Sequence, residues 1–445
     1  MTHSSGPLFV AVLGAGNVGA ALLGRLRDDA AGIAAQAGGP LRVVGVAMRD
    51  LHKARPELDP ALPRTQDPMA LATAPEVDIV VELLGGTGLA YDVVQAALAA
   101  GKAVVTANKA LLASQPGLFA DAAARGLPLG YEAAVAGAIP VMRALGVSLA
   151  GDRVRRVAGI VNGTCNYILT RMADAGLGFD AALAEAQAKG YAEADPSSDV
   201  DGEDAAFKLA LLARAGLGVE VAPSAIAREG IRGVRAEDIR RAAEVGLVVR
   251  LLAIAERVDS ENGGRVDLRV HPTLVPMSHP LASVRGPMNA IWVDAEAAGS
   301  LMFYGAGAGG LPTASAVLGD LVAAARAVRS RGAVAGLALP QAPVQPARAV
   351  DPGARRSSWH VATLVADEPG VLAAIATAFA RAGVSVESCV QHGRGGDPVE
   401  LVFVTHRAEE AAIGRALAEI EALSSVREVA SRLRVLDEGG AKGAR

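Results

Sequence analysis

The chain is poor in aromatic residues and in cysteine, and it carries little net charge. Aromatic side chains make up 3% of its 445 residues, although hydrophobic residues reach 51%. The formal net charge is -4 and the sequence pI is about 6.0, so the composition offers no basic surface for nucleic acid or for a membrane. We therefore expect neither nucleic acid nor a membrane among its partners.

The lack of paired cysteines, of a signal peptide and of a long apolar run bears on the cellular compartment of the protein. The two cysteines, Cys165 and Cys389, lie far apart and have no partners at metal-ligand spacing, which argues against a disulfide framework. The first residues, MTHSSGPL, lack the basic segment of a signal peptide, and no uninterrupted apolar run is long enough to span a membrane. We expect a cytoplasmic protein, and its length allows two or three domains.

A glycine-rich motif follows the first apolar run, residues 8–13. It reads GAGNVG at 14–19 and is a complete GxGxxG between an expected strand and an expected helix. Gly14 permits the tight turn, Gly16 lets the backbone approach a pyrophosphate, and Gly19 allows close packing of helix on strand. The helix N-terminus would add amide donors for the phosphates. The predicted cofactor contacts of this Rossmann-type loop are Gly14, Gly16, Asn17, Val18 and Gly19.

The end of the second expected strand, residues 41–47, bears on the choice of cofactor. An acidic residue at this point holds the ribose hydroxyls of NAD, whereas a basic side chain accommodates the extra phosphate of NADP. Arg49 comes first here, and Asp50 and Lys53 follow. We predict that NADP(H) is preferred and that NAD(H) is possible. Solvated basic residues in a loop are the alternative, above all for Lys53.

Two later strand ends are expected beside the cofactor, because ligands bind at the carboxyl ends of the strands in such sheets. The run 78–83 leads into Gly85 and Thr87, and the run 103–106 leads to Lys109. We predict that Gly85, Thr87 and Lys109 contact the cofactor. A surface lysine at a helix start is the alternative for Lys109.

The most informative segment reads KGYAEADPSSDVDGEDAAFK at 189–208. Asp-Pro and two serines at 195–198 should break any helix, and a helical pattern resumes near Gly202. On that helix Asp204 and Lys208 share one face, so the carboxylate can hold the ammonium in place. An acidic loop that feeds a fixed lysine suits the binding of an amino acid's ammonium and proton transfer at its oxygen. The alternative is an ordinary helical salt bridge, which is individually weak.

This segment resembles the signature of the homoserine dehydrogenase family from Gly190 through Lys208. The resemblance implies that Glu193 holds the substrate amino group, that Asp204 orients the substrate, and that Lys208 is the proton donor or acceptor. It also covers Ala107-Asn108-Lys109, where the family has a lysine that contacts cofactor and substrate. The implied catalytic residues are Lys208, Asp204 and Lys109, and the implied substrate-binding residues are Gly190, Glu193, Asp199 and Asp204.

The same resemblance implies ligand contacts in two further segments. Residues 132–140 are similar to a family segment that binds a monovalent cation, sodium, through a glutamate and backbone carbonyls. Ala136 and Ala138 stand where the family has glycine, so the turn is expected to differ slightly. The glycine-rich loop at 305–310 corresponds to one that closes over the nicotinamide, which points to Gly309. The implied cation ligands are Glu132, Val135, Gly137 and Ile139.

The expected fold class is α/β, with three domains. A Rossmann-type doubly wound sheet spans residues 1–135 and is completed by 310–340, and an α+β open-sheet domain for substrate binding and dimerisation spans 136–309. After a Pro- and Arg-rich linker at 341–356, residues 357–436 show a β-α-β-β-α-β order, which is ferredoxin-like. The tail, 437–445, is expected to be disordered.

The C-terminal segment resembles an ACT domain, with the typical Asp-x-Pro-Gly-Val-Leu at 367–372. The resemblance implies an amino-acid effector, threonine first, bound between paired copies. Ser385 stands where asparagine is common, so a pairing module without a ligand is the alternative. Both dimerising domain types predict a homodimer or a homotetramer.

Together these features predict an enzyme that interconverts L-homoserine and L-aspartate 4-semialdehyde with NAD(P), in threonine, methionine and isoleucine biosynthesis. No kinase-like domain precedes the motifs, so the resemblance is to the monofunctional enzymes. Two alternatives stay open. One is a Rossmann-type oxidoreductase on another small hydroxy substrate, and the other is a non-catalytic nucleotide and amino-acid sensor.

Overall fold

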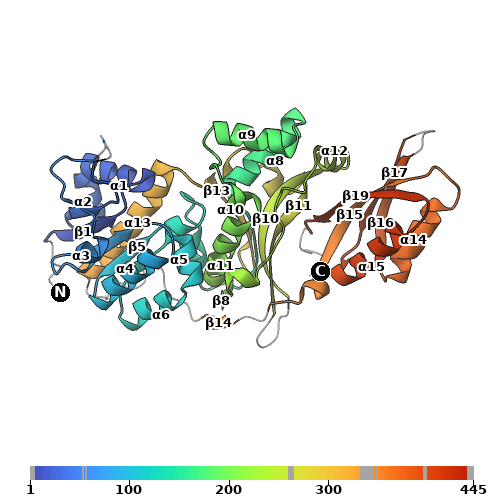
Figure 1. The fold of residues 1–445 in the computed structure, drawn as a ribbon. Helices are drawn as coiled ribbons and strands as arrows, with labels where there is room; N and C mark the ends of the chain where they lie inside the picture. The colour runs from blue at the N-terminus through green and yellow to red at the C-terminus, as the bar shows by residue number, and fades with distance from the viewer. Residues whose placement is uncertain are drawn as a thin grey trace.

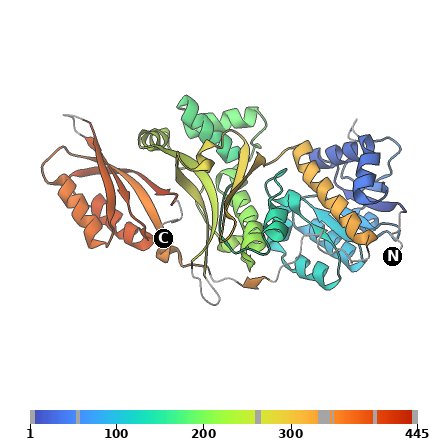
Figure 2. The same ribbon diagram turned by 180° about the vertical axis from the view of Figure 1, so that it is seen from behind.

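Three lobes lie in a row in the computed structural model, with the N-terminal lobe and the C-terminal lobe at opposite ends (Figure 1, and from behind in Figure 2). The helix α13 (Gly310–Arg329) returns from the central lobe to the N-terminal one. The structure describes residues 6–52, 55, 58–258, 265–330, 344–346, 349–393 and 398–437.

The N-terminal lobe is a parallel, doubly wound sheet with the strand order β3-β2-β1-β4-β5-β6. The predicted Rossmann-type fold is confirmed. Its central strands are buried on both faces, which is why they read as continuous apolar runs. The strands are β1 (Leu8–Leu13), β2 (Leu41–Ala47), β3 (Arg64–Thr65), β4 (Ile79–Glu82), β5 (Ala103–Thr106) and β6 (Leu129–Gly130). The helices are α1 (Asn17–Asp28), α2 (Ala30–Ala37), α3 (Pro68–Thr73), α4 (Gly88–Ala99), α5 (Lys109–Ser114) and α6 (Gly117–Ala124).

The helix α13 completes this lobe by packing against α1, α2 and β5. Among the described residues it is the one helix long and apolar enough to cross a membrane, but half of that stretch is buried inside the protein. Asp320, fully buried on this helix, accepts a hydrogen bond from the Glu132 backbone N–H at 2.7 Å. We therefore interpret α13 as a core helix.

The central lobe is built on antiparallel strands in the order β13-β12-β7-β10-β11. The helices α8 and α11 cover one face of this sheet with their apolar sides. The strands are β7 (Val154–Ile160), β8 (Val219–Glu220), β9 (Ala227–Arg228), β10 (Leu247–Arg257), β11 (Val266–Pro276), β12 (Met288–Ala295) and β13 (Gly299–Ala306). The helices are α7 (Val141–Arg143), α8 (Gly163–Ala175), α9 (Phe179–Ala188), α10 (Ser197–Val200), α11 (Glu203–Leu217) and α12 (Ala236–Glu244).

One local prediction was wrong. The Asp-Pro-Ser-Ser segment was expected to break any helix, yet α10 forms a single turn there. Pro196 occupies the cap position before that turn, where a missing N–H costs nothing. The Asp195 carboxylate also accepts a hydrogen bond from the Ser197 N–H at 3.1 Å, which fixes the entry into the turn.

The C-terminal lobe has the predicted ferredoxin-like order, with the sheet arranged β19-β15-β17-β16 and two helices on one face. Its sheet is continuous with that of the central lobe, because β19 pairs in parallel with β11 through Thr273–Arg434 and Leu274–Val435. Its elements are β15 (Arg356–Val365), α14 (Val371–Arg381), β16 (Val386–His392), β17 (Val399–Thr405), β18 (Ala408–Glu409), α15 (Glu410–Glu421) and β19 (Val426–Val435).

The predicted linker, 341–356, is only partly described. Its short strand β14 (Gln345–Pro346) pairs with β8, and the Val350 N–H donates to the Val266 carbonyl at 3.1 Å. The described part of the linker therefore lies along the central lobe rather than free of it. The segment 331–340, predicted to complete the first domain, and the tail beyond Asp437 fall outside the described residues.

Candidate active site

A cavity of about 660 Å³ lies where the N-terminal lobe meets the central one. Segments far apart in the sequence contribute to it: the start of α1, the start of α5, the turn after β6, the start of α8, the 190–208 segment and the loop before α13. Among the residues that line it are Val18, Lys109, Gly137, Asn162, Gly190, Glu193, Asp199, Asp204, Lys208 and Gly309.

Asp204 is the centre of the polar contacts in this cavity. One of its carboxylate oxygens, Oδ2, accepts hydrogen bonds from Lys208 Nζ at 2.7 Å and from Asn162 Nδ2 at 2.9 Å. The other, Oδ1, lies 3.0 Å from Lys109 Nζ. The predicted pairing of Asp204 with Lys208 on one helix face is present, and the structure adds Lys109 to the same carboxylate.

The ionised form of the Asp204 carboxyl is strongly favoured. Burial alone would raise its pKa, since its side chain is only 9% exposed. The ammonium groups of Lys208 and Lys109, together with hydrogen bonds from Lys208 and Asn162, overcome that effect and hold the pKa well below its ordinary value. Asp204 is therefore a fixed negative charge between two lysines.

Lys208 is held in one orientation. Its Nζ donates to Asp204 and also to the Val161 carbonyl at 2.7 Å, and its side chain is 12% exposed. An ammonium group has three N–H bonds. Within the described part of the chain two of them have partners, and Lys208 lines the cavity. One N–H is left to reach a ligand there.

Asn162 begins the Asn-Gly-Thr-x-Asn-Tyr segment that the family resemblance places at the edge of the substrate pocket, but no role in the site was predicted for its side chain. Its Nδ2 donates both to Asp199 Oδ1 at 2.7 Å and to Asp204 Oδ2 at 2.9 Å, and its Oδ1 accepts from the Cys165 N–H at 2.8 Å to cap α8. All the hydrogen-bonding atoms of the amide are thus engaged, in a residue that is 4% exposed. An Asn-Gly pair such as 162–163 predicts a turn, but it gives no indication of carboxylate partners.

Buried polar groups fix the position of Lys109 at the start of α5. Glu82, fully buried at the end of β4, accepts from Thr106 Oγ1 at 2.6 Å, and Thr106 in turn accepts from the Asn108 N–H at 2.9 Å. Asn108 Oδ1 accepts from the Leu111 N–H at 3.1 Å and caps the helix. Lys109 follows this cap, so the strand end aims its side chain toward Asp204.

The residues at the rim of the cavity are more exposed to solvent than those inside it. Glu193 is exposed, and Gly190 adopts a left-handed conformation with φ +75°. Beside them Thr164 Oγ1 donates to the Tyr191 carbonyl at 2.7 Å, which ties this rim to α8. The exposed Glu193 at the mouth is thus separate from Asp199 and Asp204, the two carboxylates that Asn162 joins inside the cavity.

The glycine loop after β1 fits the approach of a dinucleotide. Gly14 has φ +110°, and a Cβ on it would collide with the Leu83 carbonyl. A Cβ on Gly19 would collide with the Gly14 carbonyl, whereas the space around Gly16 is open. Each glycine thus meets the steric demand that its motif position implies. Of the predicted contacts in this loop, Val18 lines the cavity, whereas Gly14, Gly16, Asn17 and Gly19 are not among its lining residues.

The loop before α13 approaches the same glycine loop. Gly309 lines the cavity with φ +124°, a conformation that other residues rarely adopt. A Cβ on the next residue, Gly310, would lie 3.1 Å from the Asn17 carbonyl. The two loops therefore meet at the start of α1, which brings Gly309 next to the predicted cofactor loop.

The remaining predicted cofactor residues lie outside the cavity. Arg49, Gly85 and Thr87 are exposed at the ends of β2 and β4, and Lys53 falls outside the described residues. A basic residue that the sequence did not single out, Arg55, donates to the Ala15 carbonyl in the glycine loop. Arg55 therefore adds a positive charge near the expected pyrophosphate.

The predicted cation ligands lie on the turn after β6. Both oxygens of the buried Glu132 carboxylate accept backbone N–H groups, from Met142 at 2.8 Å and from Arg143 at 3.0 Å. Burial and the neighbouring Asp320 raise the pKa of Glu132 to about 7. Ala136 and Gly137 are both left-handed, with φ +57° and +56°.

The cation prediction rests on backbone carbonyls in this turn. Within the described residues no group of three or more His, Cys, Asp and Glu side chains could hold a metal ion, so Glu132 would be the one side-chain ligand. Val135, Gly137 and Ile139 would contribute carbonyl oxygens, although the Ile139 carbonyl already accepts from the Val141 N–H at 2.8 Å. Left-handed residues at 136 and 137 reorient the carbonyls of the turn.

Comparisons with known proteins agree on one family. The family model described as homoserine dehydrogenase matches residues 140–322, and that of the homoserine dehydrogenase NAD-binding domain matches 14–132. A homoserine dehydrogenase from Mycobacterium tuberculosis is 46% identical, with 97% of this chain and 98% of that protein covered. The chain belongs to the homoserine dehydrogenase family. It is an NAD(P)-dependent oxidoreductase, and this leaves no support for either alternative function.

Other relatives agree with the assignment to this family. A homoserine dehydrogenase from Corynebacterium glutamicum is 44% identical over 98% of this chain and 99% of that protein. The crystal structure of a homoserine dehydrogenase from Thiobacillus denitrificans has a TM-score of 0.90 at 42% identity, covering 97% of this chain and 99% of that one. A hyperthermophilic archaeal homoserine dehydrogenase in complex with NADPH has a TM-score of 0.60 at 26% identity, covering 72% and 97%.

The C-terminal lobe has its own match. The family model described as the ACT domain matches residues 360–425. ACT domains bind amino acids, so the match implies an amino-acid ligand for this lobe.

Proposed function

We propose that Lys208 carries the proton in the interconversion of L-homoserine and L-aspartate 4-semialdehyde. When bound, the nicotinamide supplies a hydride to the aldehyde carbon, or accepts one from the alcohol carbon in the reverse direction. In the first direction the Lys208 ammonium donates its proton to the substrate oxygen, and in the reverse direction the neutral amine accepts it. The observation that carries this role is the remaining N–H of Lys208 in the cavity, with the other two held by Asp204 and Val161.

We propose that Asp204 and Lys109 support this step. Asp204 orients Lys208 and keeps a compensating charge beside it in a nearly buried site. Lys109 is 37% exposed, lies 3.0 Å from Asp204 and lines the same cavity, so we expect it to contact both the substrate and the cofactor. Its charge stabilises the negative charge that develops on the substrate oxygen. Removing Lys109 is therefore expected to weaken binding and the rate together.

For substrate binding we propose Glu193 and Asp199, with Gly190 shaping the rim. Homoserine carries an ammonium group, and the cavity offers Glu193 at its mouth and Asp199 within it. Asn162, which joins Asp199 to Asp204, then sets the distance between the amino-acid end and the reacting end of the substrate. This arrangement would reject hydroxy compounds that lack the ammonium group.

For the cofactor we propose that NADP(H) is preferred. The exposed Arg49 at the end of β2 is available for the extra phosphate, and Arg55 adds charge beside the glycine loop. The relative described in complex with NADPH supports this preference. Gly85 and Thr87 follow β4 on the same edge of the sheet, and Gly309 closes the nicotinamide side.

We also propose a sodium ion at Glu132, with the carbonyls of Val135, Gly137 and Ile139 as further ligands. Its support is a buried carboxylate beside two left-handed residues. The ion would stabilise the turn that carries the chain from β6 to the cavity wall.

At the level of the whole protein we propose a cytoplasmic homodimer or homotetramer with L-threonine as the effector of the ACT domain. Its domains would be those predicted: 1–135 with 310–340, 136–309, and 357–436. The ACT-domain match and the exposed edge strand β16 support pairing between copies.

The test of the proposed function is homoserine-dependent reduction of NADP by the full-length protein and by Lys208→Ala. General acid–base catalysis contributes about 10²- to 10⁴-fold, so kcat should fall by about that factor in the variant. Lys189→Ala is the matched control, because Lys189 is a half-exposed lysine of the same segment that pairs with Glu185. A folded wild-type protein without homoserine-dependent activity would contradict the proposal.

A further inference from the structure

A short stretch of chain connects the C-terminal lobe to the catalytic centre. We call residues 227–232 the bridging segment and residues 197–204 the active-site turn. The bridging segment begins as β9, which pairs with β11 at the point where the sheet continues toward the C-terminal lobe. From there it runs to the active-site turn, so it touches both parts.

Arg434 anchors the bridging segment to the C-terminal lobe. Its guanidinium donates to both oxygens of Glu410, at 2.7 and 3.1 Å, and lies over the Trp359 ring at 4.5 Å. Its third nitrogen, Nη1, donates to Glu229 Oε2 at 2.8 Å. A two-pronged ion pair with a planar guanidinium has a defined geometry. Glu229 therefore pairs with a group that the C-terminal lobe holds in place.

At its other end the bridging segment packs tightly on the active-site turn. The Ile231 N–H donates to the Val200 carbonyl at 2.8 Å, and Ile231 is fully buried. A Cβ on Gly230 would collide with the same carbonyl. Arg232 Nε donates to Asp201 Oδ1 at 2.6 Å. A shift of the segment must therefore shift the turn.

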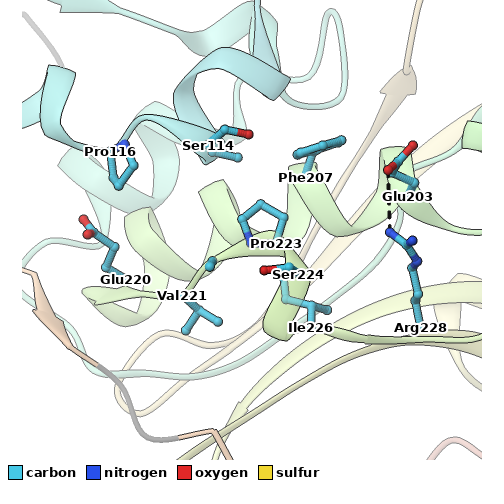
Figure 3. A pocket seen from close by; sticks show the side chains of 12 residues that line it. Ser114, Pro116, Glu203, Phe207, Glu220, Val221, Pro223, Ser224, Ile226 and Arg228 are labelled. Carbon is cyan, nitrogen blue, oxygen red and sulfur yellow. Dashed lines mark ion pairs between the residues drawn. The ribbon is translucent and has the colours of Figure 1, made fainter. Parts of the chain in front are cut away.

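A further contact reaches the residue next to the catalytic carboxylate. Arg228 and Glu203 form an ion pair at 3.8 Å, at one end of a second crevice of about 790 Å³ (Figure 3). Glu203 directly precedes Asp204 on α11. The bridging segment thus contacts the turn at Val200, Asp201 and Glu203.

The turn transmits its position to the catalytic groups through Asn162. Asp199 lies next to Val200, and its carboxylate accepts from Asn162 at 2.7 Å. The same amide donates to Asp204 at 2.9 Å. Contacts therefore run without a gap from Glu410 and Arg434 of the C-terminal lobe to the carboxylate that holds Lys208.

We propose that the C-terminal lobe positions the substrate-binding side of the active site through this segment, and that Glu229 is the positioning residue. The inference rests on the proposed roles of Asp199 and Asp204 in binding homoserine. Its consequence is specific. A change in the C-terminal lobe that moves Arg434 should alter the KM for homoserine more than the proton transfer at Lys208.

The test uses Glu229→Gln in the full-length protein, with Glu428→Gln as the matched control. Both carboxylates are about half exposed, and each pairs with an arginine across the boundary between the central and C-terminal lobes, Glu428 with Arg235 at 3.2 Å. Only Glu229 belongs to the bridging segment. Mutations along a coupled network change coupling by about 0.5–2 kcal/mol. We therefore expect the KM for homoserine to rise about two- to thirtyfold in Glu229→Gln, with kcat within about twofold.

Hydrogen exchange gives a readout that does not depend on turnover. Amide exchange in the active-site turn should be faster in Glu229→Gln than in Glu428→Gln. Gly230→Ala, which crowds the Val200 carbonyl without touching the C-terminal lobe, should give the same pattern. Equal KM values and equal exchange in Glu229→Gln and Glu428→Gln would overturn the inference. Failure of the proposed function would appear instead as a wild type that does not oxidise homoserine.

Discussion

Asn162→Asp is the substitution that most sharply separates the roles of the active-site amide. Asparagine at this position donates two hydrogen bonds to carboxylates and accepts one from the Cys165 N–H to cap α8. Aspartate keeps the acceptor, and therefore the cap. It replaces both donors by a third negative charge facing Asp199 and Asp204.

The expected loss follows from the contacts. A hydrogen bond to a charged group contributes about 1.5–3 kcal/mol, and each 1.4 kcal/mol is about tenfold in rate. Loss of the bond to Asp204 alone should therefore lower kcat/KM by about 10- to 150-fold. The added repulsion among three carboxylates should place the effect toward the upper end of that range.

The direction in which the pKa of Asp204 should change in the variant follows from its contacts. Burial raises the pKa of Asp204, and the two lysines and Asn162 hold it well below its ordinary value. The variant removes one of the lowering contacts and adds a negative charge, so this pKa must rise. Because this pKa starts well below its ordinary value, Asp204 is ionised throughout the neutral range in the wild type, and the loss of kcat/KM in Asn162→Asp should extend across that range.

The assay is homoserine oxidation followed by reduced-cofactor absorbance between pH 5 and 10. Cofactor affinity, measured separately by fluorescence, should be unchanged, because the amide of Asn162 makes its hydrogen bonds to Asp199, Asp204 and Cys165. A variant with kcat/KM within about threefold of wild type across this pH range would refute the role of this amide.

Two further predictions concern ligands. The pKa of Glu132 is raised to about 7 by burial and by Asp320, so this carboxyl favours folding below its ordinary pKa and that contribution is lost as pH rises through 7. Sodium must bind the ionised form of this carboxyl. Replacing tetramethylammonium chloride by sodium chloride should therefore raise Tm more at pH 8 than at pH 6. If sodium raises the Tm of Glu132→Gln by the same amount, the ion does not bind at Glu132. Arg49→Ala should raise the KM for NADP about tenfold and leave that for NAD nearly unchanged, and equal changes for both cofactors would contradict a phosphate contact.

Local sequence patterns predicted the elements whose physics is local. The GxGxxG between an apolar strand and a helix identified the nucleotide-binding sheet, because each glycine meets a steric demand within a few residues. The spacing of Asp204 and Lys208 likewise placed both on one face of α11, since helix periodicity fixes that relation.

Those local patterns could not predict contacts between segments that lie far apart in the sequence. The approach of Lys109 to Asp204 joins residues 95 positions apart (204 − 109), and it depends on how the two lobes pack. The two carboxylate partners of Asn162 come from α10 and α11, so no pattern around residue 162 could indicate them. The pairing of β19 with β11, which makes one sheet of two lobes, has no counterpart in the sequence pattern of either strand.

The most direct test of Lys208 as the proton carrier is chemical rescue of Lys208→Ala. Methylamine added to this variant should restore homoserine oxidation in proportion to the concentration of the free amine, because the small amine can take the space and the proton of the missing side chain. Lys109→Ala should show no such dependence. If Lys208→Ala instead retains kcat within about tenfold of wild type without added amine, the proton does not pass through Lys208 and the account is wrong.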